Sequence, residues 1–296
     1  MAIRVTQNML NSHMLRNLSN SMGSMDKYQE QLSSGRKIAR PSDDPVVATR
    51  GMFYRSSLVE NGQFQRNVNE ATSWMELADK AMDEQTSIMK RVNELAVYSG
   101  NVSLNSDSLK AIAEEIDQIK EQMGNIANQT VGGRYIFAGT DTQNPPYSYE
   151  QGDFVSTNNA EIRLEMNKSV FLPINVSGQA LFNFPSNDKN VFKLLDTISA
   201  QLKEGKDVTG YITDIQQQED NLNAQRASLG ARVNRIELIS GRLQNEEVSV
   251  NKLMSDNEDA DIASVITNLK TQENVHSAAL GAGARIIQPS LMDFLR

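Results

Sequence analysis

The residues with the clearest potential for metal chemistry are Glu273 and His276, which stand three positions apart. On a helix this Glu-x-x-His spacing directs both side chains to one face, as in the di-metal carboxylate bundles. Such a centre needs a second Glu-x-x-His and two further glutamates. The only other histidine is His13, and no glutamate stands three residues before it. Both residues also fall on a helical stripe, so we interpret His276 as an interface residue and predict no metal site.

The small-residue segment Gly281-Ala282-Gly283-Ala284 is a second candidate, because it matches part of the Gly-x-Gly-x-x-Gly fingerprint of dinucleotide-binding proteins. Ile286 stands where the third glycine is required, and no strand pattern precedes the segment. Glycine weakens a helix by roughly 1 kcal/mol relative to alanine, but it lets two helix backbones approach closely. We therefore predict close helix packing at this segment.

Other signals of catalysis are weak or missing. The acidic residues 256–261 lack the glycine and the terminal glutamate of a calcium-binding loop, so we expect a solvated surface there. The sequence contains no phosphate-binding loop and no Gly-x-Ser-x-Gly motif. Cysteine is absent, which excludes disulfides, thiolate metal sites and cysteine nucleophiles. The sequence therefore predicts neither an enzyme nor a bound cofactor.

The composition also restricts the partners. The formal net charge is −8, and no cluster of five or more Lys and Arg residues appears, so we expect no nucleic-acid partner. No apolar run approaches the ~18 residues that a membrane helix needs. The first eight residues lack the apolar core and the cleavage site of a signal peptide. If the protein leaves the cell, we expect a specialised secretion route.

Both ends of the chain carry helical stripes with alternating steps of three and four residues. Such a stripe, with an apolar period of about 3.5 residues, faces another helix. Because polar residues and glycine interrupt both stripes, we expect neither helix to be stable alone. Each needs the other, or a neighbouring subunit, which indicates assembly rather than catalysis. The stripes are Leu15, Leu18, Met22, Met25, Gln29 and Leu32, and Ile262, Ile266, Leu269, Glu273, His276, Leu280, Gly283 and Ile287.

The chain between these ends predicts long helices with one break. In Pro41-Ser42-Asp43-Asp44-Pro45, Asp44 suits an N-cap and Pro45 the first position of a new helix. The longest stripe predicts a helix of over about 50 Å, at ~1.5 Å per residue, and hence a rod. The predicted stripes run over Trp74–Leu95, Leu109–Ile126, Val191–Leu202 (with Gly205 as a stop) and Val208–Leu243.

Strand patterns interrupt the helices between residues 134 and about 186. We predict a strand at Tyr135–Gly139, another at Ile162–Met166 where apolar residues alternate with charged ones, and an edge strand at Val170–Val176. The fold class predicted is therefore mainly α: an elongated helical rod, a coiled-coil domain formed by both chain termini, and a small β-rich insertion.

Several short segments are typical of one protein family. They are Arg4-Val5-Thr6-Gln7-Asn8, Leu32-Ser33-Ser34-Gly35-Arg36-Lys37-Ile38, Pro41-Ser42-Asp43-Asp44-Pro45, Gly133-Arg134-Tyr135-Ile136-Phe137-Ala138-Gly139 and Ser290-Leu291-Met292-Asp293-Phe294-Leu295. Through them, residues 1–140 and 206–296 resemble the flagellin superfamily and, within it, the hook-associated protein 3 family of hook–filament junction proteins.

The resemblance implies a terminal coiled-coil domain (1–44 and 256–296), a helical rod domain (45–133 and 188–255) and a small outer β domain (134–187). It also implies export by the flagellar type III apparatus without signal cleavage, hence an extracellular place on the flagellum. The partners implied are hook-associated protein 1, flagellin, further copies in a ring and an export chaperone. We expect the assembly interface at Leu15, Leu18, Met22, Met25, Leu32, Ile262, Ile266, Leu269, His276, Leu280, Gly283, Ile287, Leu291 and Phe294.

Two alternatives stay open at this point. The first is a filament flagellin, although flagellins usually continue Asp-Asp with Ala-Ala-Gly, whereas Pro45-Val46-Val47 follows here. The final Leu295-Arg296, in contrast, is flagellin-like. The second alternative is a cytoplasmic helical-bundle enzyme or scaffold, which the lack of a second His–carboxylate cluster makes remote.

Overall fold

The computed structural model of the chain describes residues 7–101 and 105–287. They belong to two compact units: a terminal unit within residues 1–60 and 246–296, and a central unit of residues 61–245. Two long helices, α2 (Pro45–Ser99) and α6 (Ile212–Glu258), contribute residues to both units. The mainly helical fold with a small strand-containing middle region confirms the predicted fold class.

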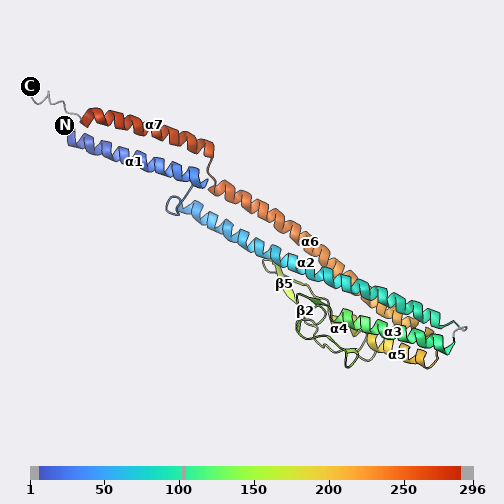
Figure 1. The fold of residues 1–296 in the computed structure, drawn as a ribbon. Helices are drawn as coiled ribbons and strands as arrows, with labels where there is room; N and C mark the ends of the chain where they lie inside the picture. Colours follow the sequence, from blue (N-terminus) through green and yellow to red (C-terminus); the bar gives the residue numbers. More distant parts are fainter. Residues whose placement is uncertain (1–6, 102–104, 288–296) are drawn as a thin grey trace, which may run out of the picture. The chain divides into compact units, whose positions relative to one another are not determined.

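In the terminal unit, α1 (Gln7–Ser34) and α7 (Ile262–Ile287) pack side by side (Figure 1). They run antiparallel, because Ser21 Oγ lies 3.4 Å from Gln272 Oε1 while Met14 lies against Gly283. The pairing of the first and last helices confirms that the two ends of the chain meet. No helix among the described residues contains a stretch long and apolar enough to cross a membrane.

The predicted break between the first two helices is present, and both aspartates serve the backbone. Asp44 Oδ1 accepts hydrogen bonds from the amides of Val46 (3.0 Å) and Val47 (3.1 Å), so it caps α2, which begins at Pro45. Asp43 accepts from the amide of Arg40 at 2.9 Å, and this bond lowers the pKa of Asp43.

The central unit contains α3 (Ser106–Ala127), α5 (Val191–Lys203) and most of α2 and α6. α2 and α6 run antiparallel, since Asn61 Nδ2 donates to the Leu243 carbonyl at 3.0 Å and Arg226 pairs with Asp79 at 3.2 Å. All four predicted stripes face the interior. Their buried members include Trp74, Ala78, Ala81, Ile88, Val92, Leu95, Leu109, Ile112, Ile116, Ile119, Met123, Ile126, Leu195, Ile198, Leu202, Ile215, Leu222, Leu229, Ile236 and Leu243.

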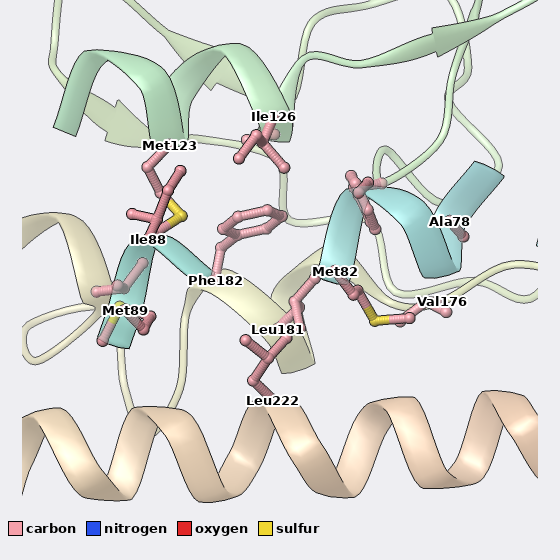
Figure 2. Close-up of a cluster of buried hydrophobic side chains, with 14 of the residues drawn as sticks. Ala78, Met82, Ile88, Met89, Met123, Ile126, Val176, Leu181, Phe182 and Leu222 are labelled. Carbon is pink, nitrogen blue, oxygen red and sulfur yellow. The ribbon is translucent and has the colours of Figure 1, made fainter. Parts of the chain in front are cut away.

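The core of the central unit forms where these helices meet residues 130–182, which contain the strands and which we call the strand region. Figure 2 shows Met82, Met123, Phe182 and Leu222 converging from α2, α3, α4 (Gly178–Phe182) and α6. The Phe182 ring has its centroid 5.4 Å from that of Phe137, 5.3 Å from Phe154 and 5.9 Å from Phe192. These contacts make Phe182 the centre of an aromatic cluster that joins the strand region to the helices.

The strand region consists of short antiparallel pairs and no larger sheet among the described residues. The pairs are β1 (Thr130–Val131) with β2 (Arg134–Tyr135), β3 (Tyr147–Ser148) with β4 (Asp153–Phe154), and β5 (Arg163–Asn167) with β6 (Val170–Pro173). Gly132 and Gly133, with φ of 55° and 78°, form the two-residue turn between β1 and β2.

The predicted strand pattern was right for Ile162–Met166 and wrong for Tyr135–Gly139. β2 ends at Tyr135, and Ile136, Phe137 and Ala138 follow it as irregular chain buried in the core. An apolar run of this length suits a buried strand or a buried loop equally well, so the pattern alone misassigned it. The strand predicted at Val170–Val176 ends at Pro173.

Side chains of the long helices hold the strand region through its backbone carbonyls. Asn67 on α2 donates to the carbonyl of Glu165 at 2.7 Å. Asn221 and Arg232 on α6 donate to the carbonyls of Ala180 (2.8 Å) and Asn175 (3.0 Å). These bonds satisfy carbonyls that irregular chain would leave unpaired. The strand region is therefore part of the same compact unit as the helices around it.

Candidate assembly surface

The described residues of the terminal unit form almost no hydrophobic interior of their own. The continuous hydrophobic core runs from Val68 to Leu243 in sequence and thus lies within the central unit. Among the described residues of the terminal unit, Ala48 and Val265 are the buried hydrophobic side chains. A helical unit that buries so little apolar surface gains little of the burial free energy that offsets chain entropy. Burial of apolar side chains among its described residues therefore contributes little to the stability of this unit.

The contact between α1 and α7 is a regular but polar seam, which we call the inner seam. Its positions advance by alternating steps of three and four residues, as in a coiled coil. Asn11 Oδ1 and His276 Nδ1 are buried there without a hydrogen-bond partner, which costs free energy. The inner seam is therefore a weak pairing surface. Its buried or half-buried members are Asn11, Met14, Leu18, Ser21, Met25, Tyr28, Val265, Leu269, Gln272, His276, Ala279 and Gly283.

Close packing in the inner seam occurs at Gly283. A Cβ added there would overlap the methyl group of Met14, so glycine is what allows Met14 to fill this position. Gly281 has no neighbouring atom within 4 Å of such a Cβ. The prediction of close packing in this segment is thus right for Gly283 and wrong for Gly281, whose surroundings are open.

A second stripe, apolar except at Gln29 and Glu273, runs beside the inner seam on one side of the helix pair. Leu15 and Met22 follow the seam residues Met14 and Ser21 by one position, and Ile266 and Leu280 follow Val265 and Ala279 in the same way. In an antiparallel pair, equal steps from the seam place side chains on the same side. We call these four residues the outer strip; they are 61%, 65%, 45% and 49% exposed, respectively.

The outer strip leaves four large apolar side chains accessible beside a seam that already pairs two helices. A coiled-coil seam needs apolar residues at the seam positions alone, whereas core-facing helices of a bundle carry a further apolar position beside the seam. Exposed apolar residues gathered in one place mark interaction sites, whereas scattered ones do not. The terminal unit also exposes Val46, Met52, Phe53, Val59, Val248 and Leu253 on α2 and α6.

An ion pair with a buried carboxylate holds the chain where α1 ends, α2 begins and α6 meets α7. The Glu258 side chain is 6% exposed, and its Oε2 accepts from Arg55 Nη1 at 2.7 Å. The Glu258 carbonyl accepts from the Lys37 amide at 2.6 Å, and the Ala260 amide donates to the Gly35 carbonyl at 2.8 Å. We call these three contacts the latch. They connect the loop after α1 to the break between α6 and α7, and so position both helices of the pair.

Gly51 on α2 is required for this latch. A Cβ at residue 51 would overlap the Glu258 carboxylate, so the substitution Gly51→Ala would expel Glu258 from its buried site and separate it from Arg55. Arg55 is 44% exposed, so solvent screens the pair and we expect a loss of about 1 kcal/mol. That loss corresponds to roughly fivefold faster hydrogen exchange at the amides of Lys37 and Ala260.

The control for this prediction is Gly23→Ala on α1, where a Cβ would have no neighbour within 4 Å. A glycine-to-alanine change in an open helix position stabilises the helix by up to about 1 kcal/mol. The two variants should therefore have effects of opposite sign. Equal protection of both amides in wild type and Gly51→Ala would refute the latch.

The residues predicted for the interface lie on two different surfaces of the helix pair. Leu18, Met25, Leu269, His276 and Gly283 lie in the inner seam, while Leu15, Met22, Ile266 and Leu280 form the outer strip. Leu32 and Ile262 continue the inner-seam spacing at the end of the pair and are 38% and 41% exposed. Leu291, Phe294 and the side chain of Ile287 lie outside the described residues. Glu273 Oε2 pairs with Lys270 Nζ at 2.7 Å.

Sequence reasoning missed the polar half of the inner seam. Asn11, Ser21 and Gln272 were missed because the predicted stripes follow a neighbouring register, which passes through Met22 and Glu273 instead. The alternating steps through residues 11, 14, 18, 21, 25 and 28 contain the signal, since Met14, Leu18, Met25 and Tyr28 share it. The exposed Phe53 and Met52 on α2 were also not singled out.

Comparison with known proteins finds a known helical region at each end of the chain. Residues 5–142 match the family model of the bacterial flagellin N-terminal helical region, and residues 212–295 match that of the C-terminal helical region. Together the two matches span most of the chain. Flagellar hook-associated protein 3 of Escherichia coli K12 is 26% identical, over 95% of this chain and 96% of that protein. Curated flagellins are more distant matches.

Solved structures share the fold. The structure of a putative flagellar hook-associated protein from Vibrio parahaemolyticus aligns with a TM-score of 0.68 at 18% identity, over 73% of this chain and 100% of that chain. Bacillus cereus FlgL aligns with a TM-score of 0.59 at 23% identity, over 69% of this chain and 99% of that chain. The paired terminal helices, the two flagellin helical regions and the full-length relative together establish that the chain belongs to the flagellin superfamily and, within it, to the flagellar hook-associated protein 3 family.

Proposed function

We propose that this protein is a structural component of the bacterial flagellum that joins the hook to the flagellin filament. The observation that carries the proposal is the contrast between a well-packed central unit and a terminal unit whose apolar residues remain exposed. Fully burying one Leu, Ile or Met side chain contributes about 1.5–3 kcal/mol. The four residues of the outer strip would therefore supply several kcal/mol per subunit on assembly, enough to offset the ordering of weakly paired helices.

We assign the assembly role to the terminal coiled coil, residues 1–44 and 256–296. The residues proposed for contacts with neighbouring subunits are those of the outer strip, together with the exposed Leu32 and Ile262 at the end of the inner seam. Leu291 and Phe294, which stand outside the described residues, complete the proposed interface. The inner seam keeps α1 and α7 together and presents the strip. Residues 45–133 and 188–255 would then serve as the helical spacer and residues 134–187 as the outer part.

The partners proposed follow from the family. Copies of this chain would form a ring that contacts hook-associated protein 1 on one side and flagellin on the other. A flagellar chaperone would cover the C-terminal helix before export, because an uncovered outer strip favours aggregation. Export would use the flagellar type III apparatus without cleavage of a signal peptide, which places the protein outside the cell on the flagellum.

Immunogold electron microscopy on intact cells tests this proposal. The antibody should be raised against the strand region, where Tyr149 and Phe171 are exposed. Gold at one point per flagellum, where hook meets filament, is the expected result. Gold along the whole filament would make the protein a flagellin, and gold confined to the cytoplasm would contradict export.

A further inference from the structure

The methionines of the chain are distributed very unequally between the two units. All five in the central unit, Met75, Met82, Met89, Met123 and Met166, are at most 1% exposed. In the terminal unit, Met9, Met22 and Met52 are 47%, 65% and 56% exposed. Met14, Met25 and Met254 are half-buried. Within the described part of the chain, open methionine side chains therefore occur in the terminal unit alone.

We propose that Met22 is a site of reversible oxidation by peroxides, and that its oxidation blocks assembly of the protein while leaving the central unit folded. In this step the thioether sulfur attacks one oxygen of hydrogen peroxide. A sulfur–oxygen bond forms and the oxygen–oxygen bond breaks. The sulfur loses two electrons, and the second oxygen leaves as water after it takes up the remaining hydrogen. The product is methionine sulfoxide, which is polar and which dedicated reductases convert back to methionine.

The position of Met22 explains why this change would matter. Met22 lies in the outer strip, seven residues from Leu15 and on the same side of the helix pair as Ile266 and Leu280. This step of the argument rests on the proposed function, in which the outer strip is buried between subunits. A sulfoxide oxygen buried there without a hydrogen-bond donor is unfavourable, whereas an unoxidised thioether adapts to its neighbours.

The same distribution explains why the fold would survive. Met82 and Met123 are completely buried in the core shown in Figure 2, so peroxide reaches them only when the central unit opens. Trp74 is 5% exposed in the same unit and reports its packing by fluorescence. Oxidation would thus block assembly of the protein but leave the central unit folded.

Peptide mass mapping of the full-length protein after treatment with hydrogen peroxide tests the chemical part. We expect sulfoxide at Met9, Met22 and Met52 at peroxide doses that leave the five methionines of the central unit unmodified. Circular dichroism and Trp74 fluorescence should remain those of untreated protein. Equal oxidation of the buried and exposed methionines in folded protein would overturn the proposal.

An assembly assay tests the consequence. Hooks isolated from cells that lack this protein would receive treated or untreated protein and then flagellin, and electron microscopy would count the filaments. We expect treated wild type to yield at least about tenfold fewer filaments, and methionine sulfoxide reductases to restore them. Met22→Leu should keep its assembly after the same treatment. Met25→Leu, the same change at a half-buried position of the inner seam, should lose assembly as wild type does.

The outcomes separate this inference from the proposed function. If untreated protein supports no filaments, the proposed function fails. If untreated protein supports filaments and oxidised wild type supports as many, the proposed block of assembly by oxidation is refuted. If Met22→Leu loses assembly after peroxide to the same extent as wild type, Met22 is not the responsible site.

Discussion

The double variant Leu15→Glu/Leu280→Glu is expected to lose essentially all filament formation while the monomer stays folded. The two residues belong to the outer strip, one on each helix, and are 61% and 49% exposed, so the isolated chain tolerates polar groups there. Exposed substitutions of this kind change the free energy of unfolding by about 0.5 kcal/mol or less. Burial of two unpaired carboxylates between subunits would instead cost several kcal/mol each.

The measurement is the number of filaments per cell in a strain that carries only the variant, with secreted protein quantified to show that export continues. The matched control is Asn17→Glu/Ala278→Glu. Both control residues are exposed and precede the seam residues Leu18 and Ala279 by one position, so they add the same charges on the opposite side of the same helix pair. Normal filament numbers in the outer-strip variant, or equal losses in both variants, would show that the strip is not the assembly surface.

The variant Phe182→Ala is expected to destabilise the central unit by about 3–5 kcal/mol, because removal of a buried phenylalanine leaves a cavity. Phe182 is completely buried and contacts three other aromatic rings, from Phe137, Phe154 and Phe192. The chain before and after the ring is held by hydrogen bonds, including that from Asn221 to Ala180, so the site has little freedom to collapse. Urea unfolding followed by Trp74 fluorescence measures the loss.

A comparison variant makes this result informative about the two units. Leu15→Ala also removes a large apolar side chain, but from a position that is 61% exposed in the monomer. Its effect on the unfolding midpoint of the central unit should be close to zero. Comparable destabilisation by both variants would contradict the view that the central unit holds the core and the terminal unit lacks one.

The long helices could be predicted from the sequence because their periodicity is local and well capped. The stripe from Leu109 to Ile126 has an apolar residue at every third or fourth position, and all six are buried. Asp44 and Pro45 likewise marked the start of α2, since a cap needs only its own neighbours in the chain. The pairing of the two ends followed from spacing and from the resemblance to flagellins. These features depend on residues close together in sequence.

The tertiary structure alone decided which side chains of the terminal helices face each other and which face outward. Leu15 and Leu18 are equally apolar in the sequence, yet Leu18 is in the inner seam and Leu15 is in the outer strip. The choice depends on α7: Gly283 admits Met14, and Gln272 meets Ser21, which turns one face of α1 inward. The latch of Glu258 over Gly51 likewise joins residues more than two hundred positions apart. Because such contacts depend on the shape of a partner element, periodicity in one segment predicts that a seam exists but not which of two neighbouring registers it uses.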